Sequence, residues 1–484
     1  MRSLLWLRSD LRAADNTALV AAMRRPTVAL YVVSPDEWAG HDVAPARVEL
    51  ILRTLRELSG SLAAINVPLL IRTVPRAGDV PTEVLDVASR LGCSEIHWNR
   101  EYEVDEGRRD AETSRLCSGM GITAHAHHDQ TAIAPDAPRT GEGRFYSVFT
   151  PFRKAWLRAW ALGPSLPKPV PAQQRPLERL ASDTVPSSIL GFQSSVPATL
   201  WPGGEMEAHA RLRRFAATGL GEYKSRRDLP AMPGTSTLSP YLAVGAISPR
   251  TCLSAACDAG GIRADQLGPE SFDAMPEGPK TWISELIWRE FYTHVLVGFP
   301  RVCMGRAFQP LTDRIRWAHN DEHLRAWQEG RTGIPIVDAG MRQLAATGWM
   351  HNRVRMITAM FLSKNLFLDW RTGETHFMRS LVDGSFASNN GGWQWSASTG
   401  TDAAPYFRVF NQFSQSVSND PQGEYIRRWV PELAHLSARD IHQPSESLSP
   451  LARARVEYPS PIVDVGASRA RAIEAFRGIR PSPV

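Results

Sequence analysis

The stretch SLLWL at residues 3–7 opens a series of short apolar runs, which continues with VALYVV (28–33), PLLIRTV (68–74) and EIHW (95–98). Each run has the length of a buried strand and carries Val, Leu or Ile. Between the runs lie segments with the helical spacing of apolar residues, and a polar helix is expected at about 105–120. This alternation predicts an α/β domain over residues 1–128, a doubly wound parallel sheet with helices on both faces.

The rest of the chain divides into two parts. Prolines cluster in GPSLPKPVPAQQRPLER (163–179), so residues 129–204 are expected to form a long inter-domain connection on the surface. From residue 205 to about 475 the apolar spacing is helical, which predicts an all-α C-terminal domain. No GxGxxG motif follows the first apolar run, so the sheet is not expected to bind a dinucleotide in the Rossmann manner.

Composition narrows the class of protein. The 484 residues are 43% hydrophobic and 22% charged, as in soluble globular proteins. Without a secretory leader or an apolar stretch of about 20 residues, the protein is expected to be cytoplasmic and to make no membrane contact. Five scattered cysteines predict neither a disulfide framework nor a zinc site, and no metal centre is expected. The net charge of +5 is compatible with a polyanionic partner, as it is with many other soluble proteins.

Two segments of the helical part combine polar and apolar residues in a way that suits ligand binding. In GTSTLSPYLAVGAISPR (234–250), small hydroxyl residues precede a helix, where they and free backbone N–H groups can bind a pyrophosphate. A plain helix cap explains the same pattern. In WISELIWREFY (282–292), Trp282, Glu285 and Arg289 share one helical face and could form the floor of a pocket. An i,i+4 ion pair between Glu285 and Arg289 is the alternative.

Two further segments stand out by their polar content. GWMHNRVRMITAMFL (348–362) places His351, Asn352 and two arginines within an otherwise apolar helix, which is compatible with an anion site or with a structural histidine. DGSFASNNGGWQWSASTGTDAAPYFRVFN (383–411) is polar and glycine-rich, so we expect a long loop rather than core. Its indoles offer flat surfaces for stacking a base or a flavin.

In their order and spacing, these segments resemble the photolyase/cryptochrome family, most closely its bacterial class I cyclobutane pyrimidine dimer photolyases. The resemblance runs from LRSDLRAADNTAL (7–19) to EYIRRWVPEL (424–433). It implies an enzyme, a deoxyribodipyrimidine photo-lyase, that binds double-stranded DNA and repairs pyrimidine dimers by electron transfer from excited FADH⁻. A cryptochrome-type blue-light receptor, which binds FAD without repairing DNA, is the alternative. Nothing in the sequence demands more than a monomer.

The resemblance also implies which residues bind FAD. They are Tyr223, Thr235, Ser236, Thr237, Leu238, Ser239, Trp282, Arg289, Asn352, Arg355, Asp383, Ser385 and Asn389. Within this set, Arg355 and Asp383 are expected to form an ion pair beside the isoalloxazine, and Asn389 to face flavin N5. Two positions depart from the family pattern, because Ser385 stands for the second Asp of DGD and Thr237 for a commonly basic residue.

By the same resemblance, a second set of residues contacts DNA and the lesion. Glu285 is expected to hydrogen-bond the dimer, and Trp288 and Trp395 to pack against it once it has been flipped out of the helix. Met356 stands where a histidine would favour (6-4) photoproducts, which favours cyclobutane dimers as the substrate. The phosphate contacts are assigned to Arg227 and Arg353.

The resemblance implies an electron-transfer chain and an antenna as well. Trp393, Trp370 and Trp317 match the chain that passes electrons to an oxidised flavin, although packing alone would explain them. The antenna residues are His41, Asp105, Glu106 and Cys303. They match part of a site for 5,10-methenyltetrahydrofolate, but Asp105 stands for the family's Asn, and Met304 for its Lys. A deazaflavin antenna or an empty site is therefore the alternative.

Overall fold

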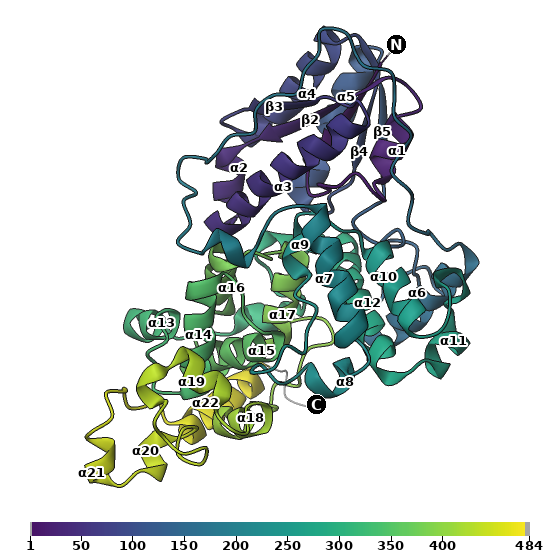
Figure 1. Cartoon of the computed structure of the whole chain (residues 1–484). Coiled ribbons are helices and arrows are strands. Elements are labelled where there is room, and N and C mark those ends of the chain that lie inside the picture. The colour runs from purple at the N-terminus through teal and green to yellow at the C-terminus, as the bar shows by residue number, and fades with distance from the viewer. Residues whose placement is uncertain (1, 480–484) are drawn as a thin grey trace. The chain divides into compact units, whose positions relative to one another are not determined.

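The computed structural model describes residues 2–479. These residues form two compact units, each of which draws on separate stretches of the chain. Among the described residues, the first unit comprises 2–224, 236–300 and 382–385, and the second comprises 225–235, 301–381 and 386–479. Figure 1 colours the chain from the purple N-terminal strands to the yellow C-terminal helices. Each unit is described by itself.

The first unit is built on the predicted parallel sheet, which has the strand order β3-β2-β1-β4-β5. The strands are β1 (Arg2–Leu7), β2 (Thr27–Val33), β3 (Leu69–Thr73), β4 (Cys93–Asn99) and β5 (Thr123–His127). All four pairings are parallel, and Leu5 lies opposite Ala29 on one side and His97 on the other. The doubly wound parallel sheet is confirmed. The fifth strand was not predicted, because its sequence TAHAH lacks an apolar run.

Helices cover both faces of this sheet, as expected for parallel strands. They are α1 (Thr17–Ala22), α2 (Pro35–Gly40), α3 (Pro45–Ala64), η1 (Ala77–Asp79), α4 (Val80–Arg90) and α5 (Val104–Gly119). Helices α4 and α5 bury one face in a core around Trp6 and Trp98. On the other face, the backbone N–H of Ala18 in α1 donates to the side chain of Asn99 in β4. Figure 1 shows α3 in front of the strands.

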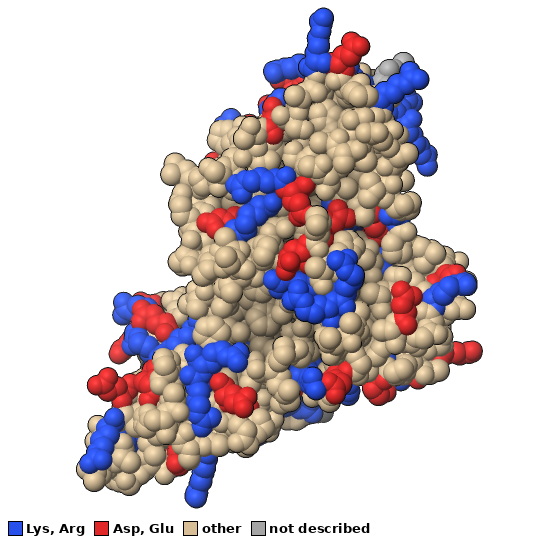
Figure 2. All heavy atoms as spheres, in the orientation of Figure 1, with Lys and Arg blue, Asp and Glu red and all other residues tan. Residues whose placement is uncertain are grey.

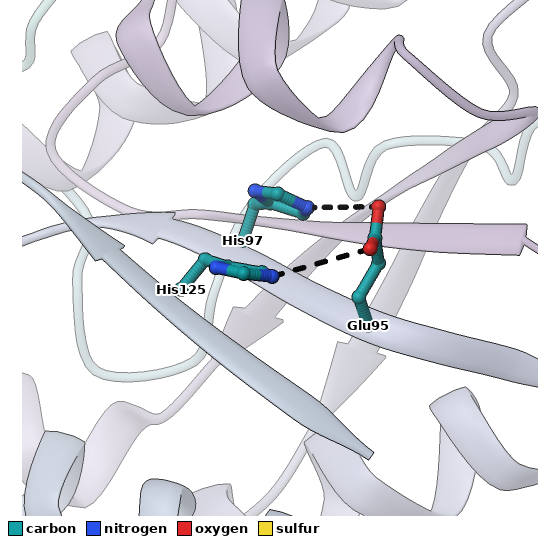
Figure 3. Close-up of side chains that lie close together, drawn as sticks. All are labelled: Glu95, His97 and His125. Atoms are coloured by element: carbon teal, nitrogen blue, oxygen red, sulfur yellow. Dashed lines mark ion pairs between the residues drawn. The ribbon is translucent and has the colours of Figure 1, made fainter.

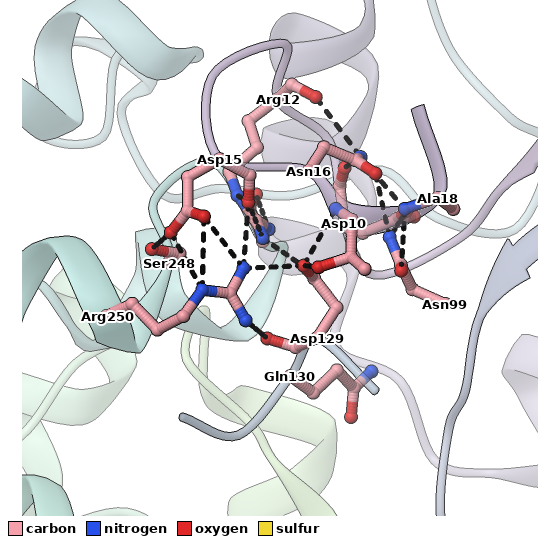
Figure 4. Close-up of polar contacts among 12 residues, drawn as sticks. Asp10, Arg12, Asp15, Asn16, Ala18, Asn99, Asp129, Gln130, Ser248 and Arg250 are labelled. Carbon is pink, nitrogen blue, oxygen red and sulfur yellow. Dashed lines mark hydrogen bonds and ion pairs between the residues drawn. The ribbon is translucent and has the colours of Figure 1, made fainter. Parts of the chain in front are cut away.

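A buried network of charged side chains ties the segments after β1 and β5 to a later helix of the same unit. Arg250 donates from Nε to the carboxylate of Asp15 at 3.0 Å and from a terminal nitrogen to Asp129 at 2.6 Å. Arg12 donates to the other oxygen of Asp129. Figure 4 shows Asp15 and Asp129 on either side of the Arg250 guanidinium, with Ser248 beside Asp15. Burial of all these charges requires such pairing, because an isolated buried ion is very costly.

The remaining helices of the first unit follow the sheet in sequence. They are α6 (Phe149–Leu162), η2 (Ala198–Leu200), α7 (Glu205–Thr218), α8 (Tyr223–Arg226, whose last two residues belong to the second unit), α9 (Ser239–Ala243), α10 (Pro249–Ala259), η3 (Ala264–Gln266), α11 (Pro269–Ala274) and α12 (Glu277–Gly298). Helix α6 lies inside residues 129–204, where sequence analysis expected only a connection. Its buried Phe152, Trp156 and Trp160 recur every four residues, which is a helical spacing.

The second unit is helical. It contains η4 (Pro300–Met304), η5 (Pro310–Arg314), α13 (Asp321–Gln328), α14 (Pro335–Thr347), α15 (Asn352–Met360), the π-helix η6 (Phe361–Leu366), α16 (Trp370–Ser380), α17 (Phe386–Ala397), α18 (Gln412–Asn419), α19 (Glu424–Trp429), η7 (Pro431–Leu433), α20 (Pro444–Ser447), α21 (Pro450–Arg453) and α22 (Val465–Gly478). Its core is rich in aromatic residues, among them Trp327, Trp370, Trp393 and Tyr425.

Two local predictions in this part of the chain were wrong. Residues 386–397 form helix α17 instead of a loop, and Trp393 within it is 2% exposed. Packing against α16 overrides the weak helix propensity of its Asn, Gly and Ser residues. His351 does not interrupt a helix but precedes α15 as its N-cap, because its Nδ1 accepts the backbone N–H of Arg353.

Within residues 2–479, no helix is both long enough and apolar enough to span a membrane.

Candidate functional site

Helix α12 positions four of the predicted site residues in the first unit. Trp282 is 4% exposed, whereas Glu285, Trp288 and Arg289 are half-buried. A terminal nitrogen of Arg289 donates to the carbonyl oxygen of Gln130 at 2.6 Å. Burial lowers the pKa of this guanidinium. Leu286 and Ile287 are buried as predicted, and Glu285, Trp288 and Arg289 share a less buried side of α12.

Tyr223 and Trp282, the two aromatic residues of the first unit that are predicted to bind the cofactor, both contact the ring of Phe215. Phe215 of α7 makes an edge contact with Tyr223 at 5.7 Å and with Trp282 at 5.0 Å between ring centroids. Such edge-to-face contacts hold rings in defined orientations. Trp288 stacks instead on Phe149 of α6, with centroids 3.7 Å apart and planes 8° from parallel. Both sets of rings are therefore fixed before any ligand binds.

The hydroxyl-rich run 235–239 is split between the two units: Thr235 belongs to the second, and Ser236, Thr237, Leu238 and Ser239 to the first. Thr237 has the left-handed φ of 50°, and its hydroxyl accepts a hydrogen bond from Arg211 of α7 at 3.1 Å. Leu238 is buried, and Ser239 is exposed. The helix that follows, α9, has only five residues.

Asp383 and Ser385 lie in the short stretch 382–385 that belongs to the first unit. The Asp383 carboxylate is 7% exposed, and Ser385 is half-buried. Arg47 of α3 donates to the backbone carbonyl of Gly384 at 2.5 Å. Burial lowers the pKa of Arg47, while the charges of nearby carboxylates, Asp383 among them, raise it. Arg47 therefore holds this stretch, although the sequence did not single it out.

In the second unit, helix α15 carries three further predicted residues. Asn352 is exposed, and Arg355 and Met356 are half-buried. Arg355 donates from Nε to the carbonyl of Met350 at 2.7 Å, and its guanidinium lies 6.0 Å from the ring centroid of Trp349. Because His351 caps this helix as an acceptor, it must be neutral. Burial favours the neutral form as well, because it lowers the pKa of His351 to about 4.

The two arginines predicted to contact DNA phosphates converge on one aspartate of the second unit. Arg353 lies 2.9 Å from Oδ1 of Asp228, and Nε of Arg227 lies 3.8 Å from the same atom. Two guanidinium groups on one carboxylate leave a net positive charge, which suits a phosphate. Sequence analysis missed Asp228, although it directly follows Arg227 in SRRDLP.

Asn389 of α17 is held by the neighbouring helix α16. Its Nδ2 donates to the backbone carbonyl of Glu374 at 3.0 Å, and the Glu374 carboxylate accepts from Asn390 at 2.8 Å. With its NH₂ group engaged, Asn389 presents its carbonyl oxygen as the atom that can accept a hydrogen bond from a ligand. Glu374 is thus a positioning residue that the sequence did not reveal.

The three tryptophans of the predicted electron-transfer chain all belong to the second unit. Trp393 and Trp370 are 2% and 0% exposed, and Trp317 packs half-buried against Phe367 and Phe476. Trp393 makes edge contacts with Phe377 at 4.9 Å and Trp327 at 6.0 Å. Within residues 2–479, the buried indole N–H groups of Trp370 and Trp393 have no hydrogen-bond partner. Trp395, two residues after Trp393, is half-buried.

Three of the predicted antenna residues meet in the first unit. Nδ1 of His41 lies 3.1 Å from Glu106, and Nε2 lies 3.7 Å from Asp105. The hydrogen bond with Glu106 raises the pKa of His41 to about 9, so this imidazole is charged at neutral pH. The fourth residue, Cys303, is half-buried in η4 of the second unit.

Two family models and several relatives match this chain. A model described as DNA photolyase matches residues 3–174, and one described as FAD binding domain of DNA photolyase matches residues 282–478. The deoxyribodipyrimidine photo-lyase of Escherichia coli (strain K12) is 42% identical over 483 residues, which are 99% of this chain and 98% of that protein. The chain belongs to the DNA photolyase family.

Solved structures of this family share the fold. A bacterial class III photolyase from Agrobacterium tumefaciens is 34% identical, with a TM-score of 0.86 over 99% of this chain and 97% of that one. The cryptochrome of Synechocystis sp. PCC6803 is 28% identical, with a TM-score of 0.84 over 99% of both chains. The predicted family and the predicted two-part fold class are therefore confirmed, and the fold is common to a photolyase and a cryptochrome.

The residues in place fit the FAD that this photolyase domain binds. The carbonyl oxygen of Asn389 is an acceptor suited to the N–H at N5 of a reduced flavin. The hydroxyls of the 235–239 run and the Arg289 guanidinium are donors suited to phosphate oxygens. The acceptor Asn389 belongs to the second unit, and the donors Arg289 and residues 236–239 belong to the first; a flavin dinucleotide requires groups of both kinds.

Charged side chains of both signs are mixed on one face of the molecule. On the face drawn in Figure 2, Lys and Arg side chains lie mostly next to Asp and Glu side chains. This face therefore shows no large patch of positive charge alone.

Proposed function

We propose that the protein is a deoxyribodipyrimidine photo-lyase, which splits cyclobutane pyrimidine dimers in DNA by using blue light and FAD. The observation that carries this proposal is the 42% identity, over nearly the full length of both chains, with an E. coli protein of that name. The constellation on α12, where Glu285 and Trp288 lie on the less buried side of a long apolar helix, supports it.

The residues of α12 would position the lesion. The Glu285 carboxylate would hydrogen-bond the dimer and stabilise the charge that the dimer gains during splitting, an effect that is strongest in a preorganised site. The Trp288 indole, held rigid by its stack on Phe149, offers a flat surface for the flipped pyrimidines. Met356 and Trp395 of the second unit would complete the contacts with the lesion, with a thioether in place of a titratable imidazole at position 356.

When bound, reduced FAD supplies a light-excited electron that opens the cyclobutane ring and then returns. The chain's own part is to hold the flavin. Trp282 and Tyr223 would pack against it, and Arg289 and the hydroxyl run would bind its phosphates. Asn389 would accept a hydrogen bond through its carbonyl oxygen. Arg355, Asn352, Asp383 and Ser385 complete the proposed set.

The substrate would be double-stranded DNA, from which the dimer must be flipped. Flipping costs a few kcal/mol, less for a damaged and poorly stacked pair, and this difference favours lesions over intact bases. Arg353 and Arg227 would hold the phosphates beside the lesion. We further propose that the protein acts as a monomer in the cytoplasm, which sedimentation and cell fractionation can test.

For the antenna, we propose 5,10-methenyltetrahydrofolate bound by His41, Asp105 and Glu106, with Cys303. The support is the charged His41 between two carboxylates, an arrangement that offers both a donor and acceptors to a pterin-like ring. The chromophore released from purified protein by heat identifies the antenna. A deazaflavin, or no second chromophore, would replace this part of the proposal.

The proposed electron path through Trp393, Trp370 and Trp317 has its own test. Trp393→Phe is expected to slow light-driven reduction of the oxidised flavin at least tenfold, while repair by chemically pre-reduced protein stays within twofold of the parent. Trp327→Phe, at an indole that contacts Trp393 but lies outside the proposed path, is the matched control. Normal photoreduction in the Trp393 variant would remove it from the path.

The deciding experiment separates repair from signalling, because the cryptochrome shares the fold. Duplex DNA with one thymine dimer is mixed with reduced protein and irradiated with blue light, and dimer loss is measured by chromatography. We expect loss in light only. Glu285→Gln is expected to lower the yield several-fold, and Glu277→Gln, at an exposed position of the same helix, is expected to leave it unchanged. No loss in light, or equal loss in darkness, contradicts repair.

A further inference from the structure

Outside the residues discussed so far, two histidines and a glutamate meet on one face of the N-terminal sheet. Glu95 and His97 are two residues apart on β4 and so point to the same face. His125 lies directly opposite His97 on the edge strand β5. Figure 3 shows the two imidazole rings one above the other, each with a nitrogen directed at the Glu95 carboxylate.

The distances between the polar atoms suit one metal ion. Nε2 of His97 lies 3.2 Å from one Glu95 oxygen, and Nε2 of His125 lies 4.0 Å from the other. One ligand atom from each residue lies within 4.8 Å of the others. Ligands about 2.0 Å from a tetrahedral zinc ion lie roughly 3.3 Å apart, so small side-chain rotations would complete the geometry.

One tautomer of His97 leaves its Nε2 atom available to a metal. Its Nδ1 lies 3.1 Å from Nε2 of His127, the next same-face residue of β5. When Nδ1–H donates to His127, the Nε2 atom of His97 carries a lone pair directed at the cluster. The side chain is 6% exposed, and its Nε2 atom lies 3.2 Å from the Glu95 carboxylate without the alignment of a hydrogen bond. In this tautomer two lone pairs face each other, an arrangement that a bound cation would relieve.

Glu95 keeps lone pairs for a metal although it has other partners. Ser3 donates to one of its oxygens at 2.6 Å, and Arg25 lies 3.2 Å from the other. A carboxylate offers about four acceptor positions, so two contacts do not saturate it. Arg25 is 44% exposed and can turn toward solvent. The side chain of His125 is 39% exposed, which gives a metal ion access from solvent.

We propose that Glu95, His97 and His125 bind one divalent transition-metal ion of the zinc class, with His127 as the residue that orients His97. Two imidazoles select zinc-class ions over magnesium and calcium, which prefer oxygen ligands. The ion would link the edge strand β5 to β4. Sequence analysis expected no metal site, because the ligands come from two strands and follow no familiar spacing.

The test uses full-length, tag-free protein from which metal has been removed with a chelator. Zn²⁺ is titrated by calorimetry, and Mg²⁺ is titrated in a parallel arm. We expect one Zn²⁺ per chain, no Mg²⁺ binding at the same concentrations, and a higher thermal midpoint with Zn²⁺. His125→Ala is expected to weaken Zn²⁺ binding at least about 100-fold. His127→Phe is expected to weaken it about 10–100-fold, as outer-shell changes do.

Two matched controls keep the result specific. His128→Ala removes the neighbouring histidine, which bonds Tyr102 instead, and is expected to leave Zn²⁺ affinity within about twofold. His41→Ala removes the histidine of the other carboxylate-rich cluster and must also leave this binding event intact. His125→Ala should unfold at the parent's midpoint in chelator, which shows that it folds. Absence of Zn²⁺ binding, unchanged affinity in His125→Ala, or loss in His41→Ala overturns the proposal.

Discussion

The two units bury polarity in opposite ways. In the first, Arg250, Asp15 and Asp129 are almost fully buried and neutralise one another through short contacts. In the second, the largest buried side chains are indoles, and those of Trp370 and Trp393 keep their N–H groups unpaired within the described residues. The first unit thus combines directional charge pairing with its own buried indoles, Trp6, Trp98, Trp156 and Trp160, whereas ring packing dominates the second.

This difference follows from what each unit must do. Charge pairs fix the angle and spacing of three segments far apart in sequence, but breaking one of them leaves an uncompensated ion. Packed rings tolerate small shifts and give a surrounding of low polarity, which suits the electron transfer proposed for Trp393 and Trp370. A substitution in the charge network of the first unit should therefore lower the free energy of unfolding by more than a substitution among the packed rings of the second unit.

The largest effect is expected from Arg250→Ala. The substitution leaves Asp15 without this cation in a buried site, and Asp129 with Arg12 alone. Loss of one member of such a buried network costs about 3–5 kcal/mol of unfolding free energy. Urea unfolding measures it, and Arg263→Ala, in an exposed ion pair with Asp265, serves as the control that should show no change. A loss below about 1 kcal/mol would mean that charge pairing does not hold this unit.

Gly373→Ala tests ring packing in the second unit. A methyl group at Gly373 would come within 2.1 Å of the Trp393 ring, so the ring must move. Overpacking of this kind costs about 1–3 kcal/mol. Gly60→Ala in α3, where nothing lies within 4 Å of the added methyl, should instead be neutral or slightly stabilising. Equal behaviour of the two variants would contradict the packing at Trp393.

His351→Asn should flatten the pH dependence of stability. Burial lowers the pKa of His351 to about 4, so its contribution is complete above the unfolded pKa of about 6.5 and is lost as pH falls toward 4. Asparagine keeps the N-cap without titrating. Between pH 6.5 and pH 5 the parent should lose about 1–2 kcal/mol more than the variant, measured by urea unfolding at each pH. Parallel curves would show that His351 does not titrate in this range.

The smallest effect is expected from Arg353→Ala. One lost phosphate contact lowers the slope of log affinity against log salt by about 1, for damaged and undamaged duplex alike. Arg325→Ala, at an exposed site of α13, is the control. Asp228→Asn should act in the opposite direction, because it frees both arginines from their carboxylate. An unchanged slope in Arg353→Ala would exclude the phosphate contact.

The fold was predictable where the local pattern and the tertiary environment agree. Strands β1 to β4 each contain a short apolar run, and such runs predict buried strands. Strand β5 alternates His with Ala and has no such signal. Helix α17 has the composition of a loop and is a helix because α16 packs against it, which no local window reveals.

The candidate site was predictable only as a set of residues. The resemblance named Asn389 and Arg353, yet their orientation depends on Glu374 and Asp228, which no motif marked. The cluster of Glu95, His97 and His125 was missed for a related reason. Its members are neighbours only through the parallel register of β4 and β5, which the sequence leaves open.

The buried Arg250 network also bears on how the protein is made. Asp15 is synthesised 235 residues before its partner Arg250. At translation rates of about 5–20 residues per second, the delay is roughly 10–50 s. During this time the strands can pair, and Arg12 can neutralise Asp129, but the Asp15 carboxylate still lacks its cationic partner. The nascent N-terminal sheet is therefore expected to stay protease-sensitive on the ribosome until α10 emerges, and to become resistant in one step.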